Sequence, residues 1–212
     1  MGGARPKQFM LLGGMPILAR TINNFAAALP GAEIVVVLPA EHTGFWHNLS
    51  ARFEVAPHTV AEGGRERFHS VKNGLAALKR DPELIAVQDG VRPLGSQELI
   101  RRTVAAAAEH GTAIPVVEPV DSFRETDGAA SQIIDRRRLR IVQTPQVFRR
   151  ELLLDALQSA AASGRSFTDD CAAVEALGQT VSATEGSYEN IKVTTPEDIL
   201  VAEAFMHREA AE

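Results

Sequence analysis

The 212-residue chain has few of the residues from which several kinds of site are built. Cys171 is the only cysteine, so an intramolecular disulfide and a thiolate zinc site are excluded. The six histidines are scattered without ligand spacing. No apolar run approaches the ~18 residues of a membrane span. No secretory core follows Met1, so we expect a cytoplasmic protein without a membrane partner.

Two common nucleotide-binding signatures are also missing. The sequence contains neither a GxxxxGK[ST] P-loop nor a GxGxxG dinucleotide fingerprint, and no GxSxG nucleophile motif. The net charge of -5 argues against general nucleic-acid binding, which usually needs a basic face. Local basic residues are therefore expected to bind small anions.

The hydrophobic content of the chain, 45%, is that of an ordinary globular protein. The length suits a single domain over residues 1–212. Apolar runs predict strands, and segments with helical spacing lie between them. The expected strands are 33–38, 53–60, 84–87, 113–117, 181–184 and 190–194. A final helix is expected from Pro196, with Thr195 as its N-cap. This alternation predicts an α/β fold with a mostly parallel sheet flanked by helices.

The alternation is interrupted between residues 120 and 143. Two extended segments flank the turn-prone pair Asp127-Gly128, which predicts a β-hairpin. Its strands carry few core residues, so we expect an arm that projects from the domain and pairs with a second subunit. The basic run 136–140 can equally be a solvated face.

The segment from Leu84 to Pro93 is the first candidate site. Its strand, expected to be buried on both faces, ends at Asp89, and ligands bind beyond the carboxyl ends of strands in open α/β sheets. The Asp89 carboxylate can hold Mg²⁺, and Arg92 can hold a phosphate. This pair suggests phosphoryl or nucleotidyl transfer, although Asp89 could also simply cap the turn and pair with Arg92.

Further basic and glycine residues lie where loops meet strands. Lys7 and Lys192 could neutralise charge that builds at a reacting phosphorus. Gly63-Gly64 precedes a helix and can present backbone N–H groups to an anion or a base edge. Each of these features alone is a weak signal, because exposed lysines and glycine pairs are common.

Five motifs in this order make the combination specific. They are PKQF at 6–9, GGRERFHS at 63–70, QDGVRP at 88–93, QTPQ at 143–146 and NIKVT at 190–194. Together they resemble the 2-C-methyl-D-erythritol 4-phosphate cytidylyltransferases of the non-mevalonate isoprenoid pathway. The resemblance extends over essentially the whole chain.

The resemblance implies a homodimer of Rossmann-like nucleotidyltransferase domains, each with a β-arm at 120–143 that embraces its partner. It implies CMP transfer from CTP to 2-C-methyl-D-erythritol 4-phosphate, with release of pyrophosphate and with Mg²⁺ as cofactor. The matching positions are, for catalysis, Lys7 and Lys192; for the nucleotide, Gly64, Arg65, Ser70 and Asp89; for the polyol phosphate, Arg92, Ser122, Arg136 and Thr144; and for the metal, Asp89.

The sequence departs from the family pattern at two places. Arg65 stands where an acidic residue is common, so contact there is expected through the backbone. The family's first strand and most of its glycine-rich loop have no counterpart before Met1. We therefore expect that the native chain starts upstream, and that this chain alone turns over weakly or not at all.

Two other functions remain open at this point. A ribitol 5-phosphate cytidylyltransferase would share the fold and the CTP site, although the 121–124 segment looks more like the methylerythritol enzymes. A non-catalytic nucleotide-binding protein is the other possibility, if the glycine-rich loop is natively absent.

Overall fold

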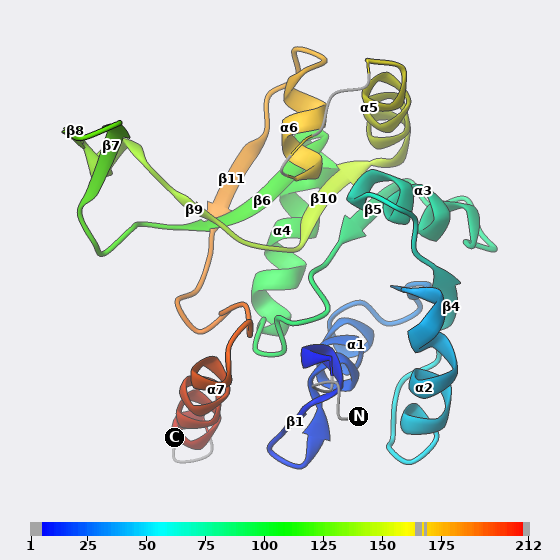
Figure 1. The fold of residues 1–212 in the computed structure, drawn as a ribbon. Coiled ribbons are helices and arrows are strands. Elements are labelled where there is room, and N and C mark those ends of the chain that lie inside the picture. The colour runs from blue at the N-terminus through cyan, green and yellow to red at the C-terminus, as the bar shows by residue number, and fades with distance from the viewer. Residues whose placement is uncertain (1–5, 164–166, 168, 210–212) are drawn as a thin grey trace.

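The computed structural model describes residues 6–163, 167 and 169–209, and in this part of the chain helices flank a mixed β-sheet (Figure 1). No described helix is both long and apolar enough to span a membrane. The helices are α1 (Ile17–Ala28), α2 (Ala40–Ser50), α3 (Arg67–Ala76), α4 (Gln97–His110), α5 (Arg150–Ser163), α6 (Asp170–Glu175) and α7 (Pro196–Glu209), with 3-10 turns η1 (Lys7–Phe9) and η2 (Arg136–Arg138). The strands are β1 (Leu11–Leu12), β2 (Met15–Pro16), β3 (Val35–Leu38), β4 (Thr59–Glu62), β5 (Leu84–Val87), β6 (Thr112–Val117), β7 (Phe123–Asp127), β8 (Ala130–Ile134), β9 (Ile141–Val142), β10 (Gln146–Arg149) and β11 (Ser182–Glu185).

The main sheet has the strand order β11-β6-β10-β5, with β9 paired to β6. β10 runs antiparallel to both β5 and β6, while β11 runs parallel to β6. The expectation of a mostly parallel sheet is therefore wrong, because β10 pairs antiparallel with both of its neighbours. β5, β6 and β11 do point the same way, but the chain returns from the arm and inserts β10 between β5 and β6 in the opposite direction.

Helices cover both faces of this sheet, as the alternation of side chains along β10 shows. Phe148 packs with Leu153 and Val174, from α5 and α6, in one apolar cluster. Its neighbour Val147 packs with Ala107 of α4 in another. Successive residues of a strand point to opposite faces, so α5 and α6 lie on one side and α4 on the other.

Strands β3 and β4 form a separate parallel pair. Among the described residues, β3 pairs only with β4, and β5 pairs only with β10. The side chains of Leu84, Ile85 and Val87 are consequently only partly buried, so the expectation that this strand is buried on both faces is wrong. Met1 and Gly2, where the family's glycine-rich loop is expected to end, lie outside the described residues.

Two predicted strands differ in the structure. The strand expected at 53–60 begins later, as β4 at Thr59. The segment 190–194 is not a strand in the described structure but an extended connection, with Val193 N donating to Val91 O at 2.9 Å. The predicted cap of the last helix is confirmed, because Thr195 Oγ1 accepts from Asp198 N at 3.3 Å.

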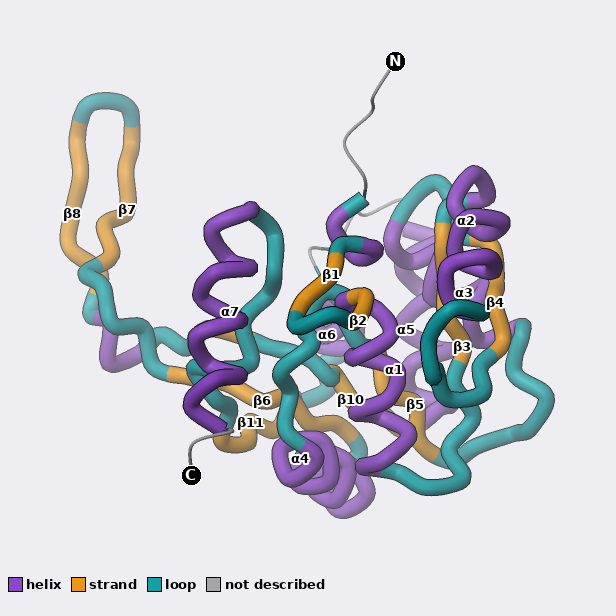
Figure 2. The backbone as a smooth tube through the Cα atoms, turned by 90° about the horizontal axis from the view of Figure 1, so that it is seen from below, coloured by secondary structure: helices purple, strands orange, loops and turns teal. Residues whose placement is uncertain are grey.

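The predicted arm is present as the antiparallel hairpin of β7 and β8, which projects away from the sheet and helices (Figures 1 and 2). Gly128 has φ +57°, a left-handed conformation that glycine tolerates best, and it closes the turn. Almost every residue of the two strands is exposed. The hairpin therefore has no core of its own within the chain.

Candidate active site

The carboxylate of Asp89, at the carboxyl end of β5, lies among three basic side chains. Its Oδ2 is 3.1 Å from Lys192 Nζ and 3.3 Å from Arg92 Nε. Its Oδ1 is 3.8 Å from Arg67 Nη1. The side chains of Asp89 and Arg92 are 13% and 11% exposed. Of the four residues expected to converge, Lys7, Asp89, Arg92 and Lys192, the structure brings the last three into contact, and Lys7 is not among these contacts.

The turn that carries Asp89 is held by hydrogen bonds on both sides. Asp89 N donates to Thr144 Oγ1 at 3.1 Å, and Arg92 N donates to Asp89 O at 3.1 Å. Thr144 directly precedes a cis proline, Pro145, and its side chain is buried. Thr144, predicted as a substrate-binding residue, therefore lies beside Asp89 and helps to fix its backbone.

Asn190 connects the segment that carries Lys192 to this turn. Its side chain is fully buried, and Nδ2 donates to Gln143 Oε1 at 3.2 Å and to Thr144 O at 3.0 Å. Its backbone oxygen accepts from Arg92 Nη1 at 2.6 Å. Asn190 thus ties the segment of Lys192 to Gln143 and Thr144 through its side chain and to Arg92 through its backbone oxygen, although the segment forms no strand.

The other end of this segment is held by Asp198, in the first turn of α7. Asp198 Oδ2 accepts from Thr194 N at 2.6 Å and from Thr195 N at 2.7 Å. These hydrogen bonds lower the pKa of Asp198 below its ordinary value, because they stabilise the charged form. Lys192 therefore lies on a connection that is anchored on both sides.

Burial and neighbouring carboxylates shift the pKa values of Arg92 and Arg67 in opposite directions. Burial lowers the pKa of Arg92, and Asp89 offsets part of that effect. Burial would also lower the pKa of Arg67, but Asp170, Asp89 and Asp169 together outweigh it, so the pKa is raised. Burial raises the pKa of Asp170, and Arg67 offsets part of the shift. The Arg67 charge is thus shared among several carboxylates.

The predicted nucleotide loop lies before α3. Gly64 N donates to Ser70 Oγ at 3.0 Å, and Ser70 Oγ in turn donates to Glu66 O at 3.3 Å. A Cβ on Gly64 would lie 2.3 Å from His69 Cβ, so only glycine fits. Gly64 and Ser70 are therefore brought together as predicted, while the Arg65 side chain is exposed.

Three predicted site residues lie outside this cluster. Lys7 is exposed, and its backbone oxygen accepts from Met10 N at 3.0 Å. Ser122 and Arg136 flank the projecting arm, where Arg136 Nη1 donates to Val120 O. Among the contacts of the described residues, none joins these three side chains to Asp89.

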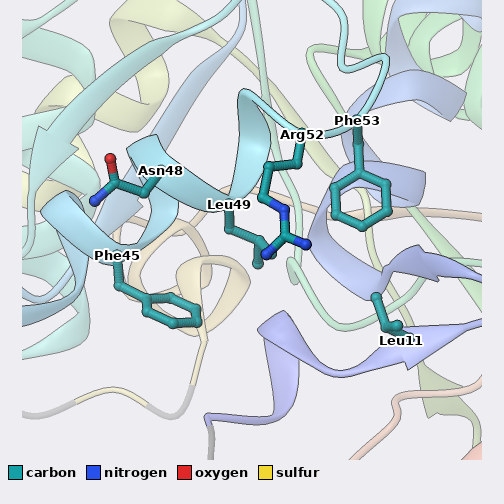
Figure 3. Close-up of a pocket in the computed structure, with 6 residues that line it drawn as sticks. All are labelled: Leu11, Phe45, Asn48, Leu49, Arg52 and Phe53. Carbon is teal, nitrogen blue, oxygen red and sulfur yellow. The ribbon is translucent and has the colours of Figure 1, made fainter.

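A pocket whose lining includes none of the predicted site residues lies beside β1 and α2 (Figure 3). It has a volume of about 380 Å³ and an apolar lining from β1, α2 and the loop after α2, formed by Leu11, Phe45, Asn48, Leu49, Arg52 and Phe53. A triphosphate needs charged groups, so this pocket does not suit a nucleotide. A second pocket, about 260 Å³, is lined in part by Arg67 and Asp170.

Comparison with known proteins identifies the family. Residues 1–208 match the family described as 2-C-methyl-D-erythritol 4-phosphate cytidylyltransferase. Relatives of that name from Bacteroides thetaiotaomicron and Geobacillus kaustophilus are 44% and 42% identical, over 97% and 100% of this chain and 93% of each relative. The chain belongs to the 2-C-methyl-D-erythritol 4-phosphate cytidylyltransferase family.

Solved cytidylyltransferase structures share the fold. The enzyme from Thermus thermophilus is 33% identical, with a TM-score of 0.80 over 95% of this chain and 94% of that one. The 4-diphosphocytidyl-2C-methyl-D-erythritol synthase from Anaerococcus prevotii is 27% identical, with a TM-score of 0.84 over 93% and 88%. The predicted activity, methylerythritol phosphate cytidylyl transfer in isoprenoid synthesis, is confirmed, and the ribitol alternative is disfavoured.

Sequence reasoning missed two charged members of this cytidylyltransferase site. Arg67 stood out only as part of the motif at 63–70, and Asp170 was not among the candidate residues. In the structure Asp169 alone caps α6, through Oδ1 to Ala172 N at 2.9 Å, and Asp170 is left to pair with Arg67. Two adjacent aspartates at a helix start were the signal, because one is enough to cap it.

Proposed function

We propose that Asp89, Arg92 and Lys192 form the centre at which the phosphate of 2-C-methyl-D-erythritol 4-phosphate meets the α-phosphate of CTP. The observation that supports this most is the approach of Lys192 and Arg92 to the same Asp89 oxygen, within 3.1 and 3.3 Å. Lys192 lies on the connection between β11 and α7, and Asp89 and Arg92 follow the end of β5. Such an arrangement suits a ligand that carries several negative charges.

The reaction needs little beyond the positive charge of these basic side chains. A phosphate oxygen of the polyol phosphate attacks the α-phosphorus of CTP, and the bond to the β-phosphate oxygen breaks to release pyrophosphate. The attacking phosphomonoester is largely dianionic near neutrality, since its second pKa is ~6, so no general base is required. Lys192 and Lys7 neutralise charge at the α-phosphate, and Arg92 holds the attacking phosphate.

Mg²⁺ belongs to the proposal through Asp89. The described residues contain no group of three or more His, Cys, Asp or Glu side chains placed to hold a metal ion. One carboxylate is nevertheless typical of Mg²⁺ sites in which substrate phosphates provide the remaining ligands. When bound, the ion would offset the charge of the triphosphate. Asp89 is the residue that would hold it.

The base and ribose of CTP are assigned to the loop before α3. Gly64 lets the loop pack against His69 because it carries no side chain, and Ser70 Oγ fixes the loop by accepting from Gly64 N. Arg65 follows in the chain and is exposed. We assign contact at Arg65 to its backbone, as the sequence comparison with the family pattern suggests.

The arm is assigned to a homodimer, in which Ser122 and Arg136 reach the site of the partner. Exposed apolar side chains on and beside the arm support this assignment, with Val120 70% and Ile133 64% exposed. Long exposed hairpin strands are usually covered in the native assembly.

The cytoplasmic location expected from the sequence also belongs to the proposal, and cell fractionation would test it.

End-point phosphorus NMR tests the substrate assignment. The protein at high concentration is incubated with CTP, Mg²⁺ and either methylerythritol phosphate or ribitol 5-phosphate, so that even slow turnover accumulates product. We expect pyrophosphate and a cytidine diphosphate product with methylerythritol phosphate, and neither from the Asp89→Asn variant. Product with ribitol 5-phosphate alone would contradict the substrate assignment. Equal product from Asp89→Asn would contradict the proposed site.

A further inference from the structure

We propose that Asp170 is a positioning residue that holds the Arg67 cation away from Asp89, and so keeps the Asp89 carboxylate available to Mg²⁺. The inference rests on the proposed function, because it concerns the metal that Asp89 is proposed to hold. It assigns a role to two residues, Arg67 and Asp170, that the reaction chemistry does not itself require.

The geometry places one guanidinium between two carboxylates. Arg67 Nη2 donates to Asp170 Oδ2 at 2.7 Å, whereas Arg67 Nη1 lies 3.8 Å from Asp89 Oδ1. Asp170 therefore makes the closer contact. Arg67 is the first residue of α3 and Asp170 the first of α6, so the pair also joins the start of the helix behind the nucleotide loop to the start of a second helix.

The charges explain why this contact matters. Asp89 already has Lys192 and Arg92 within 3.3 Å of Oδ2, so Oδ1 is the oxygen with the more distant cation. A guanidinium that moved onto Oδ1 would compete directly with a metal ion for that oxygen. Asp170 is 3% exposed and has Arg67 as its ion-pair partner, so a buried carboxylate holds the guanidinium in place.

The arrangement predicts a specific pattern in three variants. Asp170→Asn keeps the shape of the side chain and an oxygen that can accept from Arg67, but it removes the charge that draws Arg67 from Asp89. Arg67→Met combined with Asp170→Asn removes the competing cation as well, without leaving a buried charge unpaired. Asp81→Asn is the matched control, because Asp81 pairs with Arg150 at 2.8 Å before β5, at the end opposite Asp89.

The measurement is the dissociation constant of CTP by calorimetry, in excess Mg²⁺ and in EDTA, for the full chain and these variants. The ratio of the two constants reports how far Mg²⁺ assists CTP binding, independently of turnover. We expect Asp170→Asn to reduce this ratio about tenfold, the size typical of losing a residue that orients a metal ligand. The double variant should restore the ratio, and Asp81→Asn should leave it unchanged.

Turnover provides a second measurement that a merely structural role would not change in the same way. We expect the rate of Asp170→Asn to recover as the Mg²⁺ concentration rises, because the ion displaces Arg67 by mass action. An unchanged ratio in Asp170→Asn, or a double variant as impaired as Asp170→Asn, would overturn the inference. If Mg²⁺ assists CTP binding in the parent protein and product forms, that failure leaves the proposed function intact. If Mg²⁺ does not assist CTP binding at all, both the metal assignment and this inference fail.

Discussion

Asn190 is the residue whose replacement should disturb the site most through structure alone. Its side chain is fully buried and donates to Gln143 Oε1 and to Thr144 O. In Asn190→Ala both hydrogen bonds are lost, each contributing about 1 kcal/mol. Gln143 Oε1 keeps a partner, because Ser187 N also donates to it at 3.2 Å. Thr144 O has no other donor among the described hydrogen bonds, which adds about 1–3 kcal/mol.

These contributions sum to about 3–5 kcal/mol. Removal of Asn190 Oδ1, a buried oxygen without a hydrogen-bond partner among the described residues, offsets part of them. The free energy of unfolding of Asn190→Ala should therefore fall by about 3 kcal/mol. Urea denaturation followed by circular dichroism measures the change. At a slope of about 2 kcal/mol/M the midpoint should fall by about 1.5 M, with the slope itself unchanged. The folded fraction should also lose turnover, because Lys192 and Arg92 are both held through Asn190.

The matched control is Asn48→Ala, which removes an exposed amide on α2. Surface changes of this kind usually stay within about 0.5 kcal/mol. A loss below about 1 kcal/mol in Asn190→Ala would refute the reasoning, because the buried hydrogen bonds would then not hold the segment. A loss of similar size in Asn48→Ala would refute it as well.

Three further predictions concern catalysis, assembly and acid stability. Lys192→Met should lower kcat by about 10²–10³, the loss typical of one charge-stabilising group, while Lys79→Met leaves kcat unchanged, and steady-state kinetics would measure both. If the arm completes the partner's site, mixing inactive Lys192→Met and Arg136→Ala subunits should restore about a quarter of the activity, because about half of the randomly paired dimers are mixed and each mixed dimer has one intact site of two. Native mass spectrometry would confirm that the subunits exchange. No recovery of activity after exchange would argue against a shared site. The lowered pKa of Asp198 means that its stabilising contribution is present above the unfolded pKa, ~3.9, and is lost as the pH falls through the folded value. Asp198→Asn should therefore unfold more easily at neutral pH, and the difference in unfolding free energy should shrink below about pH 4; a difference independent of pH would contradict the assignment.

The sequence predicted the parts of the fold that depend on local patterns. The hairpin around Gly128 follows from turn chemistry, and the start of α7 follows from Thr195 and Pro196. Pairing within the main sheet did not follow, because the insertion of β10 between β5 and β6 is a long-range choice. The segment 190–194 resembles a strand in composition, but the buried Asn190 side chain and not a strand ladder holds it.

The candidate site was predictable to a similar extent. Asp89 and Arg92 are three residues apart on one turn, so their proximity follows from the sequence. Lys192 stood out only as an isolated basic residue where a loop meets a strand, and the family resemblance assigned it to the same site. Arg67 and Asp170 were missed because they are 103 residues apart and meet only through the packing of α3, α5 and α6. Ser122 and Arg136 flank the arm, as expected of groups assigned to a partner subunit. Lys7 was expected to converge with Asp89, Arg92 and Lys192, and no contact among the described residues joins it to them.

A crystal structure with CTP and Mg²⁺ bound would test the assignment of the nucleotide site most directly. We expect electron density for the triphosphate within hydrogen-bonding distance of Lys192 Nζ, with the metal ion on Asp89 and the cytosine beside Gly64. Density for the nucleotide in the apolar pocket between Phe45 and Phe53, with the surroundings of Asp89 unchanged, would contradict it.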